Sequence, residues 1–110
     1  MPKLCRINIE NRQEIYGKIE KFIEKLKKKY PVHFIYLYGS FAKNQIHEGS
    51  DIDLVIVGDF KGTFLEIIEK ILDLTDLPIE PLVYTDSEFE QMKNSKNPLI
   101  MEVVKTGKKY

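Results

Sequence analysis

The stretch that decides the fold is YGSFAKNQIHEGSDIDLVIV, residues 38–57. It ends one apolar run, VHFIYLY (residues 32–38), and opens another, DIDLVIV (residues 51–57). The first run is rich in β-branched and aromatic residues and the second in β-branched residues, which predicts two β-strands. The first run is apolar at nearly every position, so we expect it in the middle of a sheet that is covered on both faces.

Two carboxylates begin the second predicted strand. Asp51 and Asp53 stand two residues apart, so their side chains leave the same face, while Ile52 points to the core. Two like charges on one face repel each other, and a fold that keeps both ionised must usually supply a cation. Oxygen ligands in this arrangement suit Mg²⁺ or Mn²⁺, together with substrate phosphate.

Gly39 and Ser40 follow the first predicted strand, where a short helix over residues 40–44 is expected to begin. A glycine at this junction lets the backbone approach a ligand, and the Ser40 hydroxyl with free N–H groups can hold phosphate oxygens. If these residues share one site with the two aspartates, the first and second strands are antiparallel neighbours.

A third carboxylate, Glu80, lies near the start of a third predicted strand, IEPLVY (residues 79–84). A helix over residues 63–74 makes the connection long enough for parallel pairing with the second strand. Parallel pairing brings Glu80 beside Asp51 and Asp53, and Pro81 favours an edge position. Such a site would hold two metal ions and align a hydroxyl for attack on an α-phosphorus.

Further helices surround these strands. Asn11 and Glu14 form a capping-box pattern that opens a helix ending before Pro31, and residues 85–94 and 98–107 predict two more. We expect a single domain over residues 1–110, with a small three-stranded mixed sheet flanked by helices, of the α/β or α+β class.

Composition narrows the class of protein further. The chain has 110 residues with 17 Lys and Arg against 17 Asp and Glu, and a single cysteine, Cys5. A single cysteine excludes an internal disulfide. The equal numbers of basic and acidic residues argue against a broad basic face, so a nucleic-acid partner is not expected. No apolar run is long enough to span a membrane and the N-terminus has no apolar signal core, which predicts a cytoplasmic protein.

Gly-Ser, ten residues, and then Asp-Ile-Asp-Leu resembles the signature of the DNA polymerase beta nucleotidyltransferase superfamily. The short chain points to its minimal nucleotidyltransferase (MNT) branch. The resemblance implies Gly39 and Ser40 as binders of a nucleoside triphosphate, and Asp51, Asp53 and Glu80 as catalytic metal ligands. It also implies that the chain is an antitoxin paired with a HEPN-domain toxin. In such a pair the antitoxin transfers AMP from ATP onto a hydroxyl of the toxin.

The chain departs from this pattern at two places. Many relatives carry arginine shortly after Gly-Ser, whereas Phe41 and Lys43 occupy that region here. Lys43 is expected to contact a phosphate as a point charge, without the bidentate fork of arginine. The third acid of relatives is more often aspartate, and the longer Glu80 side chain need not coordinate as tightly.

Other interpretations of the same residues stay open. The chain could be a catalytically inactive module that neutralises a HEPN-type partner by occlusion with its terminal helices, or a transferase that modifies nucleic acid. Self-association into a homo-oligomer is also possible. In an unrelated α/β domain, Asp51 and Asp53 would only cap a strand, and Glu80 would be an ordinary exposed acid. Tyr36, Tyr38 and Tyr84 are interpreted as core or pocket walls.

Overall fold

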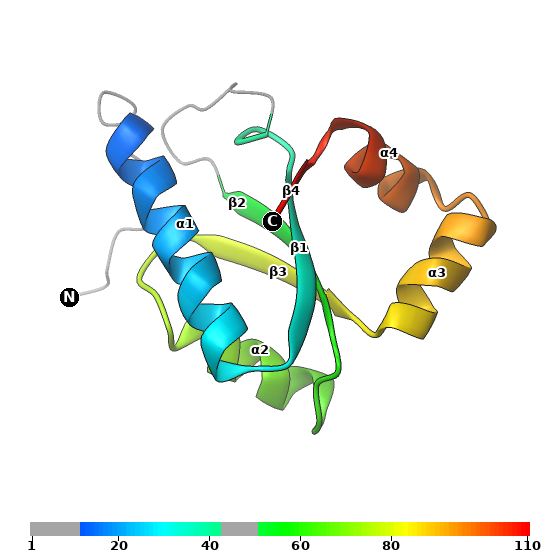
Figure 1. Cartoon of the computed structure of the whole chain (residues 1–110), viewed down its shortest axis with the longest axis horizontal. Coiled ribbons are helices and arrows are strands. Elements are labelled where there is room, and N and C mark those ends of the chain that lie inside the picture. The colour runs from blue at the N-terminus through cyan, green and yellow to red at the C-terminus, as the bar shows by residue number, and fades with distance from the viewer. Residues whose placement is uncertain (1–11, 43–50) are drawn as a thin grey trace.

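The computed structural model of the chain describes residues 12–42 and 51–110, and Figure 1 shows the arrangement. Within these residues, the four helices and the first three strands follow the order that the sequence predicts. The elements are α1 (Arg12–Lys29), β1 (Val32–Tyr38), β2 (Ile52–Gly58), α2 (Phe64–Leu72), β3 (Ile79–Tyr84), α3 (Asp86–Asn94), α4 (Pro98–Thr106) and β4 (Lys108–Lys109). In the described part of the chain, no helix is long and apolar enough to cross a membrane.

The strands form one mixed sheet in the order β3-β2-β1-β4. β1 and β2 are antiparallel, whereas β2 and β3 are parallel, so both pairing predictions are confirmed. β3 lies at the edge, where Pro81 lacks a backbone N–H to donate. The predicted count of three strands is wrong, because the two-residue β4 pairs antiparallel with β1 and makes a fourth.

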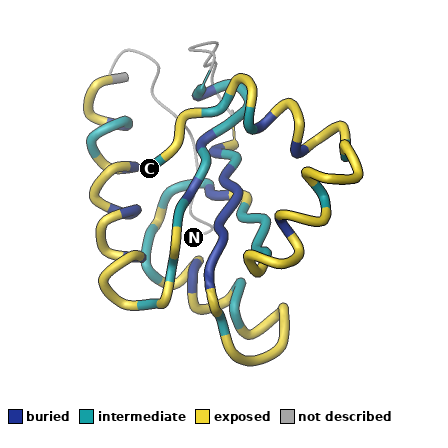
Figure 2. Tube along the Cα trace, turned by 45° about the vertical axis from the view of Figure 1, so that its right-hand side comes forward, coloured by how far each residue is buried: buried dark blue, intermediate teal, exposed yellow. Residues whose placement is uncertain are grey.

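Helices cover both faces of the sheet. α1 and α2 pack on one face, around buried side chains that include Ile19, Leu37 and Ile71. α3 and α4 pack on the other face, where Val55 and Phe89 are buried. β2 is buried along nearly its whole length, as the dark central path in Figure 2 shows. β1 alternates between buried and half-buried residues, so its cover is less complete than its apolar sequence predicts.

Side chains at the helix starts fix where the later helices begin. The Thr85 side chain accepts a hydrogen bond from the Glu88 amide, and the Glu88 side chain accepts one from the Thr85 amide, which confirms the predicted capping box. Thr63 caps α2 through the Glu66 amide. α2 ends at Leu72, two residues earlier than predicted, because its last turn closes on Asp73.

Candidate active site

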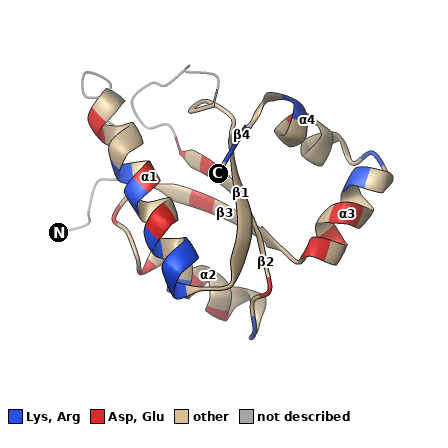
Figure 3. Cartoon of the chain, viewed as in Figure 1, with Lys and Arg blue, Asp and Glu red and all other residues tan. Residues whose placement is uncertain are grey.

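Three polar side chains form a row across the sheet. Asp53 of β2 is in register with Tyr38 of antiparallel β1 and with Glu80 of parallel β3. Residues in register across neighbouring strands project from the same face of the sheet. All three therefore lie on the face on which α3 and α4 pack, which also carries Val55. Figure 3 shows acidic positions on neighbouring parts of β2 and β3. The predicted meeting of Asp53 and Glu80 is therefore present.

The environment of Asp53 favours its protonated form. Burial raises its pKa to about 6, and a hydrogen bond with the Glu80 side chain and the negative charges of Glu80 and Asp51 act in the same direction. Desolvation and like charges both penalise a carboxylate, so this end of β2 carries electrostatic strain. A cation bound between the carboxylates would relieve that strain.

Tyr38 belongs to this group, although the sequence indicates a core or pocket wall, with a ring stacked on the nucleotide base as the alternative. Burial raises its pKa to about 12, and the charge of Asp53 is the next largest cause. The phenol is therefore neutral and able to donate a hydrogen bond beside the carboxylates. A signal for this position is present in the sequence, because Tyr38 directly precedes Gly39 and antiparallel pairing sets it opposite Asp53.

Gly39 is required at the end of β1 for two separate reasons. Its φ angle of +73° lies in the left-handed region, which other residues rarely adopt. A Cβ atom at this position would also overlap the Asp53 carboxylate oxygen. The backbone of Gly39 therefore passes directly over the carboxylate, as expected for a residue that lets the chain approach a ligand.

Ser40, Phe41 and Ala42 form turns after β1, so the helix predicted from Ser40 is not present over these residues. Phe41 is buried, and its ring meets the Tyr16 ring edge to face at 5.9 Å. The Tyr16 hydroxyl also donates a hydrogen bond to the Phe41 carbonyl oxygen. Phe41 thus anchors the turn that carries Ser40 to α1. Lys43, the third predicted nucleotide contact, lies outside the described residues.

Asp51 is exposed and directly precedes β2. Within residues 12–42 and 51–110, no group of three or more His, Cys, Asp or Glu side chains is arranged to hold a metal ion. The structure brings Asp53 and Glu80 together, and the negative charge of Asp51 helps to raise the pKa of Asp53. The chemistry of this set fits Mg²⁺ or Mn²⁺, because hard divalent cations prefer carboxylate oxygens and water.

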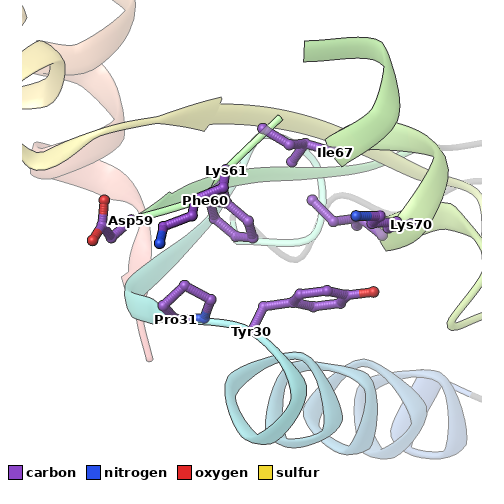
Figure 4. Close-up of a pocket in the computed structure, with 8 residues that line it drawn as sticks. Tyr30, Pro31, Asp59, Phe60, Lys61, Ile67 and Lys70 are labelled. Atoms are coloured by element: carbon purple, nitrogen blue, oxygen red, sulfur yellow. The ribbon is translucent and has the colours of Figure 1, made fainter. Parts of the chain in front are cut away.

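A hollow of about 410 Å³ lies at the opposite end of β2, between the end of α1 and α2 (Figure 4). Tyr30 and Pro31 line one side, and Ile67 and Lys70 of α2 line the other. The Phe60 ring lies between them, 6.1 Å from the Tyr30 ring centre. The length of β2 separates this hollow from the Tyr38–Asp53–Glu80 row.

The fold is that of nucleotidyltransferases. A crystal structure from Sulfolobus solfataricus, described as a "putative nucleotidyltransferase", aligns over 76% of this chain and 78% of its own, with a TM-score of 0.60 and 16% identity. A structure described as a toxin-antitoxin with AMP-PNP aligns over 90% of this chain and 71% of its own, with a TM-score of 0.56 and 23% identity.

Residues 20–109 match the model of the family described as "Polymerase beta, Nucleotidyltransferase", so the chain belongs to this family. The match includes Gly39, Ser40, Asp51, Asp53 and Glu80. The family and the nucleotidyltransferase class expected from the sequence are therefore confirmed.

Two relatives from Methanocaldococcus jannaschii carry related names. "Putative protein adenylyltransferase MJ1547" is 40% identical over 62 residues, which are 56% of this chain and 51% of the relative. "Putative protein adenylyltransferase MJ0604" is 33% identical over 79 residues, which are 69% of this chain and 79% of the relative. The matched segment thus spans about half the length of the first relative.

Proposed function

We propose that the chain is a Mg²⁺-dependent nucleotidyltransferase that transfers AMP from ATP to a hydroxyl of a partner protein. The partner in this proposal is a HEPN-domain toxin, for which the chain is the antitoxin. The observation that carries the proposal is the register of Asp53 with Glu80, directly beneath the Gly39 backbone. The names of the relatives and the toxin-antitoxin fold neighbour support the substrate and partner.

Each residue of the site has a distinct role in this proposal. Asp51, Asp53 and Glu80 would hold two Mg²⁺ ions, with Mn²⁺ as a substitute, and these ions supply charge neutralisation for the triphosphate and the departing pyrophosphate. The Gly39 backbone and the Ser40 hydroxyl hold phosphate oxygens, and Lys43 adds a positive charge. The neutral Tyr38 phenol would offer a hydrogen-bond donor beside the carboxylates.

The reaction joins two partners in line. The acceptor oxygen forms a bond to the α-phosphorus of ATP, while the bond from that phosphorus to pyrophosphate breaks and the acceptor proton passes to solvent. Gly39 and Ser40 fix the phosphates so that the α-phosphorus faces the acceptor, which lowers the entropic cost of the reaction. In this proposal the acceptor hydroxyl belongs to the partner protein.

Transfer of label from ATP tests the proposal. The purified chain is incubated with Mg²⁺, α-labelled ATP and the proposed HEPN-domain partner. We expect label on the partner with the wild-type chain and none with Asp53→Asn. Asp59→Asn is the matched control, because Asp59 is an exposed aspartate that follows the other end of β2.

A second candidate function is occlusion without catalysis. Leu99 and Met101 of α4 are exposed, and these side chains give a terminal helix an apolar surface for docking. In that case Asp53→Asn still neutralises the partner and no label is transferred by either chain. Loss of both label transfer and neutralisation in the variant selects the enzyme instead.

A further inference from the structure

The outer face of α2 carries an unusual amount of exposed apolar surface. Among the residues that the structure describes, five large apolar side chains are exposed, and three of them are on this nine-residue helix. Leu65 is 72% exposed, Phe64 57% and Leu72 41%. Contiguous exposed apolar side chains on a small protein mark an interaction surface more often than isolated ones do.

The spacing of these side chains makes a continuous stripe. Leu65, Ile68 and Leu72 follow the i, i+3, i+7 pattern of one helix face, and Phe64 lies beside them. Ile71 is fully buried on the inner side, and the same apolar face of α2 continues from it round to Leu72 and Leu65, which are exposed. We call the outer set of Phe64, Leu65, Ile68 and Leu72 the α2 stripe. The apolar face of α2 is therefore wider than the part that the core covers, which leaves its outer edge open to a second surface.

Charges beside the α2 stripe are acidic. Helical periodicity places Glu69 directly next to Leu65 and Leu72, and Asp73 follows farther round. Both acids are exposed, whereas the only lysine of α2, Lys70, lies on the side away from the stripe and lines the hollow near Tyr30. Two copies of α2 packed antiparallel would therefore set acid against acid, which costs free energy. The charges favour a partner with basic residues.

The position of the α2 stripe leaves the carboxylates accessible. α2 packs on the sheet face that carries Leu37 and Leu54, whereas alternation along β2 directs Asp53 to the opposite face. The chain leaves α2 at Leu72 and returns to the start of β3, where Glu80 lies. A segment bound along the stripe and continuing past Leu72 reaches the edge of the sheet that carries Glu80.

We propose that the α2 stripe is a docking site for a basic amphipathic helix of the partner protein, which it holds while the acceptor hydroxyl enters the active site from the edge at β3. The identification of this partner as the acceptor rests on the proposed function. The docking itself does not, because it requires neither ATP nor catalysis.

A pair of peptides tests the docking chemistry. One is a 14-residue amphipathic helix with leucines on one face and lysines on the other, and its counterpart carries glutamates in place of the lysines. Binding to the wild-type chain is measured by calorimetry. We expect the leucine–lysine peptide to bind and the leucine–glutamate peptide to bind at least tenfold more weakly. Equal binding of the two peptides would overturn the proposal.

Matched surface variants locate the binding. Leu65→Ser with Leu72→Ser should weaken the leucine–lysine peptide at least tenfold, whereas Met101→Ser on α4 should leave it unchanged. Met101 is 43% exposed, close to the 41% of Leu72, and it belongs to the α4 surface of the occlusion alternative, so the two variants decide between the two surfaces. An equal loss with Met101→Ser contradicts the assignment to α2. A wild-type dimer in sedimentation that the double variant converts to monomer would show that a second copy covers the stripe.

The HEPN-domain protein then connects docking to the reaction. In the label-transfer assay, the Leu65→Ser, Leu72→Ser variant should raise the KM for the partner at least tenfold with little change in kcat. An unchanged KM overturns the docking role even where AMP transfer occurs. If no AMP is transferred by the wild-type chain, the proposed function fails, and the peptide measurements still decide the docking site.

Discussion

The start of β2 places Asp53 against Glu80 and under Gly39, whereas its end packs Gly58 against the backbone of Pro31 and Val32. At the start, neighbouring carboxylates raise the pKa of Asp53, and this arrangement costs folding free energy. At the end, the glycine allows the chain to pack closely, and this arrangement stabilises the fold. Under the proposed function, one strand therefore serves binding at one end and stability at the other, and variants at the two ends should behave in opposite ways.

The largest expected difference is in activity. Asp53→Asn should lower kcat/KM for AMP transfer about 1000-fold, equivalent to about 4 kcal/mol of transition-state stabilisation, because a neutral amide binds a divalent cation poorly. Asp59→Asn at the other end should leave kcat/KM within about twofold. Steady-state label transfer measures both. A fully active Asp53→Asn variant would break the assignment of this end to catalysis.

Alanine substitutions at Gly58 and Gly39 should lower the unfolding free energy by different amounts. A Cβ atom at Gly58 would overlap the Pro31 carbonyl oxygen and lie 2.9 Å from Val32 Cα, so Gly58→Ala should cost about 3 kcal/mol of unfolding free energy. At Gly39 the overlapped atom belongs to the Asp53 side chain, which can move, so Gly39→Ala should cost only the strain of its φ angle, about 1–2 kcal/mol. Urea unfolding measures both values.

The loss of ATP binding should be larger for Gly39→Ala than for Gly58→Ala, which is the opposite of the order expected for the loss of stability. Gly39→Ala should abolish ATP binding measured by calorimetry. The added Cβ atom would displace the Asp53 carboxylate, which would then occupy space that the proposal gives to the phosphates of ATP. Gly58→Ala should bind ATP normally at temperatures where it is folded. The comparison fails if Gly58→Ala is the variant that loses ATP binding.

Added Mg²⁺ should stabilise the folded chain through the carboxylates at the start of β2. Mg²⁺ at about ten times its dissociation constant should raise the unfolding free energy of the wild-type chain by about 1.4 kcal/mol, through binding to the folded state. Asp53→Asn should show almost no increase, and Asp59→Asn should behave as wild type. Thermal melts with Mg²⁺ and with EDTA measure the difference. An equal increase in all three chains would indicate a site elsewhere.

The smallest expected effect is on the pH dependence of stability. The pKa of Asp53 is about 6 in the folded chain and 3.8 in a model compound. The folded state therefore holds a proton more tightly, and the stability that this gives is complete below about pH 4 and lost as the pH rises through about 6. Asp53→Asn should lack this fall and be more stable by about 1 kcal/mol at neutral pH, since water screens part of the repulsion.

Much of the fold could be predicted because its signals are local. The apolar runs of β1 and β2, the Thr85 capping box and Pro98 each determine a structure within a few residues of themselves. β4 has no such signal, since Lys108 and Lys109 are exposed and gain their pairing only from β1. A two-residue strand made by tertiary contact cannot be recognised from periodicity.

Some features of the candidate site could also be inferred from the sequence, and others could not. Strand register could be inferred from the spacing of Asp53 and Glu80, because parallel pairing follows from the length of the connection through α2. The turn at Ser40 could not be inferred, because Phe41 is held by Tyr16, which is 25 residues away in the chain. The place of Tyr38 in the site follows from the antiparallel register of β1 and β2, which sets it opposite Asp53, whereas an aromatic residue in an apolar run indicates packing when taken by itself.

Pro81 at the edge of the sheet has a consequence for the behaviour of concentrated solutions. An uncovered edge strand is a template on which another chain can add a strand of its own, and this is a common route to fibrils. The ring of Pro81 removes a donor from the middle of six-residue β3 and so interrupts any such ladder. Replacing it with valine would restore that donor and make the chain more prone to aggregate.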